Sequence, residues 1–315
     1  MAPPQQPGTP IAAHSRILNA YLQYGLWIGA TLVAFSGPVR SLLRFAQEND
    51  DASHIVVIPI LSAIIICFER KRIFARVSRE FVVSASLAAL AIGLTAVTAL
   101  GHAAWDFSSI LAAYTLALVL LWIGGFAFFF GRDAARAARF PLFFLVLAVP
   151  LPKFLLAHVV HALQSGSAAI VGAIFEVTGT PFLREGFVFQ LGRISIEIAE
   201  ECSGIRSSVA VLILALLAAH FYLRSFWKQA VFVACSLLIM IVKNGVRIAT
   251  LTFLSIYVNP AFLFGRLHRD GGVVFFLFGM VLLLPVLWGL QRGENVTLPS
   301  QGNPPNTESN PSKIC

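Results

Sequence analysis

Long apolar blocks separated by short polar segments dominate this chain. A helix needs about 20 apolar residues to cross the hydrocarbon core of a bilayer, and eight blocks approach or exceed that length. We therefore predict eight membrane-spanning helices, of which the second and fifth are short: Ile17–Gly37, His54–Glu69, Phe81–His102, Phe107–Gly131, Phe140–Leu156, Ser203–Leu223, Phe226–Arg247 and Val273–Leu290. The predicted fold class is an all-α polytopic membrane protein.

The two ends of the chain have a different composition. Residues 1–16 are rich in Pro and Gln, and residues 291–315 end in a segment rich in Pro, Asn and Ser, so we expect both to be disordered and cytoplasmic. The first apolar block is too long for a signal-peptide core and lacks a cleavage pattern, so we expect an uncleaved span. The predicted division is a membrane domain over residues 17–290 with two polar tails.

The stretch between the fifth and sixth predicted spans does not fit the simple pattern. Its apolar part, residues 154–179, has two interpretations: a helix that lies on or dips into the membrane, or a ninth span that reverses the sidedness of everything after it. Farther on, Ile194, Ile196 and Ile198 alternate with smaller or polar residues, which is the period of a half-buried strand. Together with "FVFQ" before the turn, this predicts a small β-hairpin outside the membrane.

Composition and charge agree with a membrane protein. Hydrophobic residues make up 57% of the chain and charged residues only 12%, about half the usual charged share of a soluble domain. The net charge of +8 comes from basic segments that follow the even-numbered spans, namely "ERKRIFARVSRE", "GRDAARAARF", "LRSFWK" and Arg292. Basic loops remain on the cytoplasmic side. We therefore expect contacts with membrane lipid rather than nucleic acid, both termini in the cytoplasm, and a multi-pass inner-membrane location.

The four cysteines have no metal-ligand spacing, so the sequence predicts no metal site, no cofactor and no disulfide framework. One of them, Cys202, lies in "EIAEECSGIRSS" at the predicted outer start of the sixth span. Asn244 and Arg247 lie near the predicted outer end of the seventh span, three residues apart and on one side of the helix. His268 follows in the next outer loop, so the topology brings these side chains to one membrane face.

These residue types suit acyl transfer through a thioester. A thiol at a helix N-terminus is more easily ionised, and Arg206, one turn farther on, adds to the effect. A histidine can take and return a proton, and an arginine can hold the oxyanion that forms during attack on an amide. A structural interpretation stays open for each of them: Cys202 as a small packed residue, Arg247 as an arginine that reaches the interface, and His268 as a solvated loop residue.

Three short sequences in order, "ECSGIRSS", "NGVRI" and "HRDGGVVFF", resemble the exosortase/archaeosortase family, which are polytopic membrane cysteine transpeptidases of bacteria and archaea. Two upstream stretches, "SHIVVIPILSAIIICFERKR" and "FPLFFLVLAVPLP", fit as well. The resemblance covers most of Ser53 to Leu290. It implies that Cys202 is the nucleophile, that Arg247 stabilises the tetrahedral intermediate, and that His268 is the acid/base.

The resemblance also implies a substrate. Members of this family recognise exported proteins by a C-terminal sorting signal, which consists of a Pro-containing motif, a transmembrane helix and a basic cluster. They cleave near the motif and are thought to transfer the new carboxyl end to an acceptor, often alongside exopolysaccharide genes. We expect the same here, with the site on the extracytoplasmic face and an acceptor that the sequence does not identify. We further expect Asn244 to position Arg247, and Arg206 to orient Glu201 or the substrate.

One residue departs from the family pattern, and two other functions remain open. Glu201 stands before Cys202, where a small apolar residue is expected, and its charge opposes ionisation of the thiol. The chain can also be a transporter with Asn244, Arg247 and His268 along a polar path, or an assembly factor for an exported polysaccharide. A transporter tolerates loss of the thiol but not of Arg247, and an assembly factor tolerates the loss of any one of the three.

Overall fold

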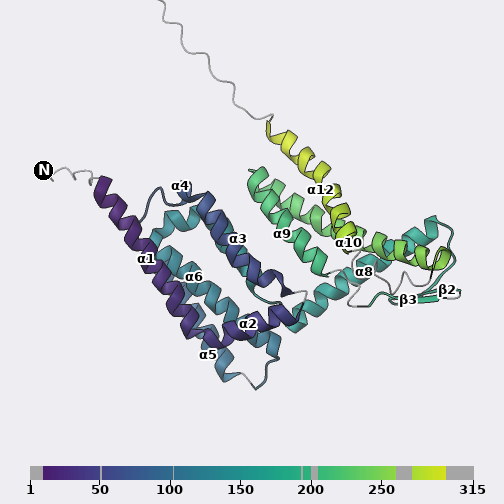
Figure 1. Ribbon diagram of the computed structural model, residues 1–315, viewed down its shortest axis with the longest axis horizontal. Coiled ribbons are helices and arrows are strands. Elements are labelled where there is room, and N and C mark those ends of the chain that lie inside the picture. Colours follow the sequence, from purple (N-terminus) through teal and green to yellow (C-terminus); the bar gives the residue numbers. More distant parts are fainter. Residues whose placement is uncertain are drawn as a thin grey trace, which may run out of the picture.

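The structure is a computed structural model that describes residues 10–49, 52–101, 103–192, 194–199, 205–259 and 272–295. These residues form helices α1 (Pro10–Ala34), α2 (Ser36–Glu48), α3 (His54–Phe68), α4 (Arg70–Ile73), α5 (Val82–Leu100), α6 (Phe107–Ala137), α7 (Arg139–Phe144), the 3₁₀ helix η2 (Leu145–Ala148), α8 (Lys153–Val177), α9 (Ile205–Tyr222), α10 (Phe226–Tyr257) and α12 (Gly272–Asn295). Three strands complete the fold: β1 (Leu183–Glu185), β2 (Val188–Leu191) and β3 (Ile194–Glu197). Figure 1 shows their arrangement.

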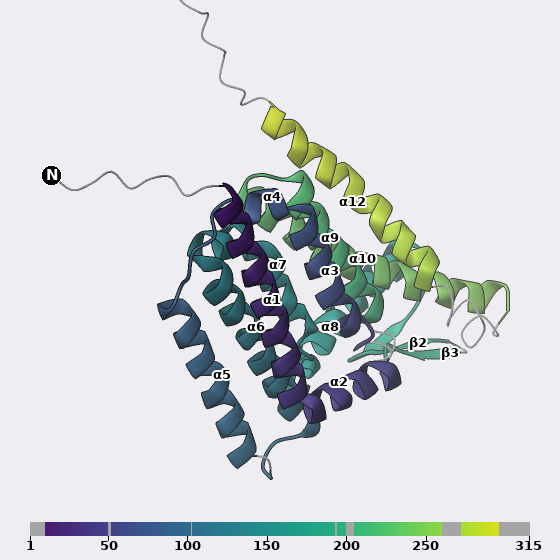
Figure 2. The same ribbon diagram turned by 60° about the vertical axis from the view of Figure 1, so that its left-hand side comes forward.

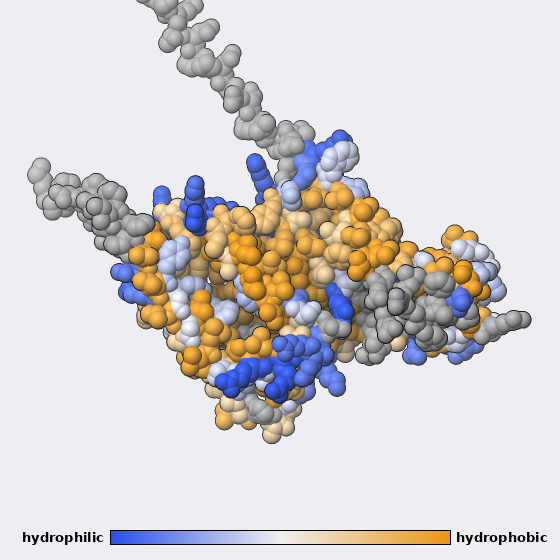
Figure 3. All heavy atoms as spheres, in the orientation of Figure 1, coloured by the Kyte–Doolittle hydropathy of each residue, from blue (hydrophilic) through white to orange (hydrophobic). Residues whose placement is uncertain are grey.

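Seven of the described helices are long and apolar enough to cross a membrane: α1, α5, α6, α8, α9, α10 and α12. Helix α3, with 15 residues, is shorter and contains Pro59. Large apolar side chains such as Leu26 and Val82 are about three-quarters exposed, as lipid-facing side chains are. Figure 3 shows hydrophobic residues over much of one face of the molecule. The predicted class, an all-α polytopic membrane protein, is confirmed.

The basic segments gather at one end of the helices, as their alternation along the sequence predicts. Arg72 of α4 donates to the Ala137 carbonyl at the end of α6, over 3.1 Å. Helices α3 and α9 end side by side, because His220 Nε2 lies 2.9 Å from Glu69 Oε1. Lys228, at the start of α10, donates to the Leu290 carbonyl of α12 over 3.0 Å. Figure 2 shows the start of α1, helix α4 and the end of α12 toward the same end of the molecule.

The predicted fifth span, Phe140–Leu156, is not one continuous helix. Helix α7 ends at Phe144 and continues into η2, which ends at Ala148. Residues 149–152 are not helical, and α8 begins at Lys153. The two prolines explain the break: proline lacks an N–H donor and disfavours helical backbone at the residue before it. Val149, which precedes Pro150, is accordingly extended (φ −80°, ψ 120°).

This broken segment nevertheless crosses between the two ends of the helical bundle. Residues 149–152 line the same cavity as Trp105 and Asp106, which lie just before α6 begins. Six α-helical, four 3₁₀ and four extended residues cover roughly 30 Å, the thickness of a hydrocarbon core. Leu142 and Phe144 of α7 and Ala148 of η2 are buried, and Pro150 in the non-helical part is buried as well.

Residues 154–179, for which two interpretations stood open, form most of the 25-residue helix α8. By length and composition this helix qualifies as a membrane span. Figure 1 shows it extending to one side of the other helices together with the second half of α10. The chain then turns back along it, because Gln164 of α8 donates to the Ile198 carbonyl after β3, over 2.9 Å.

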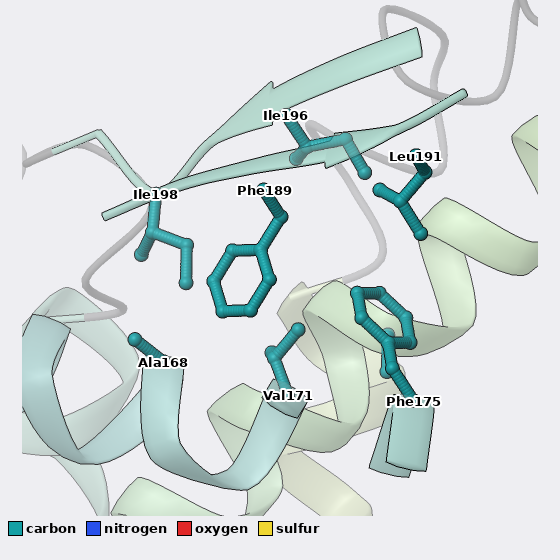
Figure 4. Packing of buried hydrophobic residues seen from close by; sticks show 8 residues of the cluster. Ala168, Val171, Phe175, Phe189, Leu191, Ile196 and Ile198 are labelled. Atoms are coloured by element: carbon teal, nitrogen blue, oxygen red, sulfur yellow. The ribbon is translucent and has the colours of Figure 1, made fainter. Parts of the chain in front are cut away.

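The predicted β-hairpin is present and belongs to a three-stranded antiparallel sheet of order β1-β2-β3. Strand β2 pairs with β3 in a register that sets Leu191 opposite Ile194, with Gly192 at φ +61° in the turn. One face of the sheet covers α8, as Figure 4 shows: Phe189, Leu191, Ile196 and Ile198 pack on Ala168, Val171 and Phe175. The sheet therefore fixes the course of the chain that leads toward Cys202.

Only the inner ends of the two predicted tails are described, and both are helical: residues 10–16 belong to α1 and residues 291–295 to α12. Helix α1 begins at Pro10 and α12 ends at Asn295, and the residues beyond them are not among those described. The division into a membrane domain over residues 17–290 and two disordered tails therefore remains a prediction.

Candidate functional site

Helix α10 extends well beyond the predicted end of its span at Arg247. It comprises 32 residues, from Phe226 to Tyr257. No proline interrupts "RIATLTFLSIY", and its apolar residues pack on α8, so the helix has no reason to stop at the arginine. Asn244 and Arg247 consequently lie inside the helix rather than near its end, which corrects the sequence-based placement.

Asn244 joins α10 to α8. Its side chain is 1% exposed, and its amide Nδ2 donates to Ser167 Oγ over 3.0 Å. The next residue lets the backbones come this close, because a Cβ at Gly245 would lie 2.5 Å from Ile170 Cγ2 and 3.2 Å from the Ser167 carbonyl oxygen. Buried polar groups need such partners. The structure therefore holds the Asn244 side chain in one place on α8.

Lys243 joins α10 to α9 and α12. Its side chain is 1% exposed, and its Nζ donates to Ser207 Oγ in the first turn of α9. Its aliphatic stem runs beside Gly279 of α12, where an added Cβ would lie 3.7 Å from Lys243 Cγ and Cδ. Among the described residues, Lys243 is the one charged residue that is buried. A buried charge is costly unless it is bonded.

The sequence contained a signal for Lys243 that our interpretation did not use. The lysine stands directly before Asn244 within an apolar block, and ionisable residues inside such blocks usually mark a functional site. The prediction of sidedness uses only the basic residues of the loops.

Arg247 lies on α10 close to Lys243 and Asn244, and Arg206 lies on α9 next to Ser207. Arg247 is half-buried and four residues after Lys243, so both cations share one side of α10. Arg206 is exposed and directly precedes Ser207. The structure thus brings Asn244 and Arg247 of α10 near the first turn of α9, which carries Arg206. Glu201, Cys202 and His268 lie outside the described residues.

The place of Cys202 in the chain still relates it to this junction. Helix α9 begins at Ile205, three residues after Cys202, and Ser207 follows two residues later. Lys243 therefore bonds to the helix turn that follows the cysteine in the sequence. Helix N-termini favour a nearby negative charge, and a cation there adds to this effect.

An open cavity of about 740 Å³ lies between the first half of α8 and the sheet. It is lined by His158, His161 and Gln164 on one side and by Phe187, Glu197 and Ala199 on the other. Ala199 is three residues before Cys202. In the described part of the chain, no group of three or more His, Cys, Asp or Glu side chains is placed to hold a metal ion.

Comparison with known proteins identifies the family. Residues 46–285 match the model of the transmembrane exosortase family, Exosortase_EpsH. Neither the curated proteins nor the solved structures gave a significant match. The family match includes the α8–α10 junction, the first turn of α9, and the positions of Cys202 and His268. It spans about three-quarters of the chain, so this protein belongs to the transmembrane exosortase family.

Proposed function

We propose that this protein is a membrane-embedded cysteine transpeptidase. It cleaves the C-terminal sorting signal of exported proteins and transfers the new carboxyl end to an acceptor. The observation that carries the proposal is the bond from Lys243 to Ser207. Lys243 lies one turn before Arg247 on α10, and Ser207 lies in the first turn of α9, which follows Cys202 in the sequence. The family match and the placement of Asn244 and Arg247 on the same stretch of α10 support it.

The first half of the proposed reaction forms a thioester. The Cys202 thiolate attacks the scissile carbonyl carbon, a C–S bond forms, and negative charge develops on the carbonyl oxygen. The Arg247 guanidinium stabilises that oxyanion. When the intermediate collapses, the C–N bond breaks and His268 gives a proton to the departing amine.

The second half releases the product. An acceptor nucleophile attacks the thioester carbonyl while His268 takes its proton. The C–S bond then breaks and the Cys202 thiolate is restored. Water as the acceptor makes the outcome hydrolysis, whereas an amine or hydroxyl group makes it transfer. No cofactor is required for either half.

Asn244 and Arg206 have supporting roles in this proposal. Asn244, held by Ser167, keeps the α10 turn against α8 and so positions Arg247 one turn away. Arg206 is exposed at the start of α9, where it can pair with Glu201 or with the substrate. An Arg206→Ala or Asn244→Ala variant that trims substrate at the wild-type rate would remove that residue from the site.

The substrate enters from the membrane. Since the sorting signal includes a transmembrane helix, it reaches the site laterally between helices of this protein. The cleaved bond lies on the extracytoplasmic side, opposite the basic ends of α4, α6 and α12. We infer an inner-membrane location from the same assignment of the cytoplasmic and extracytoplasmic sides.

A processing assay in membranes tests the proposal. The chain is co-expressed with a tagged exported protein that carries a candidate sorting signal, and wild type is compared with Cys202→Ala, Arg247→Ala and His268→Ala. The matched control is Cys235→Ala, a partly buried thiol elsewhere on α10. We expect trimming by wild type and the control only, and a thioester at Cys202 by mass spectrometry.

Other outcomes point to other functions. Equal trimming by wild type and Cys202→Ala would exclude Cys202 as the nucleophile. If a secretion phenotype tolerates loss of the thiol but not of Arg247, a transporter is favoured. If it tolerates loss of each residue, an assembly factor is favoured.

A further inference from the structure

The burial of Lys243 is energetically unfavourable, and the packing of the helices does not require it. This lysine is buried to 1% exposure, yet Arg247 stands four residues later on the same side of the helix. Like charges at this spacing destabilise a helix. Removing an ammonium group from water costs free energy, which its hydroxyl partner among the described residues offsets only in part. An apolar side chain of similar length at this position would serve the packing better.

The contacts of Lys243 show what it holds. Its stem lies beside Gly279 of α12, and its ammonium group reaches Ser207 in the first turn of α9. The residue on its C-terminal side, Asn244, is bonded to Ser167 of α8. One stretch of α10 thus fixes α8, α9 and α12 relative to one another, and the contact with α9 is the one that depends on a charge.

We propose that Lys243 is a positioning residue for the reaction at Cys202. Its ammonium group fixes the first turn of α9 through Ser207, so its positive charge lies at the helix turn that follows Cys202 in the sequence. The inference rests on the proposed function, which needs Cys202 as a thiolate next to two glutamates. A positive charge at this helix turn favours the thiolate, whereas Glu200 and Glu201, its neighbours in the sequence, oppose it.

Two measurements separate this role from a purely structural one. The first is thermal stability of the purified protein in detergent, for wild type and Lys243→Met. Methionine has a similar length and no charge, so we expect Tm to stay level or rise. A structural role for the lysine predicts the opposite, since the bond between α10 and α9 would be lost.

The second measurement is the pH dependence of Cys202 alkylation, in a background where Cys67, Cys235 and Cys315 are replaced by Ser. It needs no substrate. We expect Lys243→Met to move the alkylation midpoint up by about one pH unit, a tenfold loss of thiolate at neutral pH. Ser207→Ala, which keeps the charge but loses the bond, should give a smaller shift. The other charges near this thiol in the chain or on α10 are the same in all variants: Glu200, Glu201, Arg206 and Arg247.

Lys228→Met is the matched control, because it removes a lysine from the same helix at the opposite end of the molecule. Its alkylation midpoint should equal that of wild type. In the processing assay, Lys243→Met should lower kcat at least about tenfold with little change in KM, as the loss of thiolate requires, whereas the control should not.

The outcomes are distinct. A Lys243→Met protein with lower Tm and an unchanged alkylation midpoint overturns the proposal. If Lys243→Met does not accumulate in cells, the Ser207→Ala variant is the test. An unchanged alkylation midpoint together with a wild-type kcat in Ser207→Ala overturns the proposal. If wild type trims no substrate while the midpoint still rises in Lys243→Met, the proposed reaction fails and the role of Lys243 toward the thiol stands.

Discussion

Asn244 donates a 3.0 Å hydrogen bond to Ser167, and both side chains are almost completely buried between α10 and α8. The two residues are 77 positions apart in the sequence. This bond connects the helix that carries Arg247 to the helix on which the β-sheet packs. It sets the depth and rotation of α10 at the point where the candidate chemistry is placed.

The first prediction concerns this bond. Asn244→Ala leaves Ser167 buried without its donor, so we expect a loss of about 1–3 kcal/mol in the free energy of unfolding and at least tenfold slower processing. A double-mutant cycle with Ser167→Ala measures the coupling, which should exceed about 0.5 kcal/mol. The control is Ser236→Ala, a buried serine of α10 that bonds within its own helix. Additive effects of the two substitutions would contradict the prediction.

The second prediction concerns Gly245, where the backbones of α10 and α8 come close together. Gly245→Ala would set a Cβ 2.5 Å from Ile170 Cγ2, so α8 and α10 must separate, at a cost of about 1–3 kcal/mol. Gly289→Ala is the matched control, since an added Cβ on that turn of α12 meets nothing within 4 Å. Thermal denaturation in detergent should show a lower Tm for the first variant and an equal or higher Tm for the second. Equal Tm values for both variants would show that the contact is unimportant.

The third prediction concerns the end opposite the candidate chemistry. Glu69 Oε2 lies 2.6 Å from Arg72 and Oε1 lies 2.9 Å from His220, whose ring stacks on Phe140 at 3.8 Å. Because this carboxylate is only 16% exposed, Glu69→Gln should lower stability by about 1–3 kcal/mol. The exposed pair Arg136–Asp133 is the control, and Asp133→Asn should change stability by less than about 0.5 kcal/mol. Processing per folded molecule should be the same in both variants, and a selective loss in Glu69→Gln would mean that this end takes part in the reaction.

The fourth prediction concerns the start of α6. The Asp106 carboxylate accepts hydrogen bonds from the side chains of Ser108 and Ser109 and from the Ser109 backbone N–H, which lowers its pKa to about 2. A lowered pKa means that the carboxylate stabilises the folded protein at pH values above its ordinary pKa near 4. This contribution fades as the pH falls toward 2. Wild type should therefore lose more stability than Asp106→Asn between pH 5 and pH 3, as measured by tryptophan fluorescence, and parallel losses would contradict this assignment.

Much of the fold could be predicted from the sequence because a bilayer imposes simple rules. Apolar blocks of sufficient length become helices, which is why the helices around Ile17, Val82 and Phe107 appear where they were expected. The alternation of basic segments predicted which helix ends lie together, and the bonds Arg72–Ala137 and Lys228–Leu290 confirm that grouping. The hairpin over residues 187–198 followed from strict alternation of side chains.

The candidate site was predictable in residue type but not in position. The sequence determined that an apolar chain carries Asn244 and Arg247 three residues apart, and a thiol before another span. Only the tertiary structure decided that α10 runs ten residues past Arg247, that prolines break the segment after α7, and that Lys243 is buried against α9. The physical reason is that hydropathy measures what a side chain prefers as its solvent. The partner of a buried polar group depends on the surfaces of neighbouring helices that are distant in the sequence. The residue at which a helix ends depends on the same surfaces.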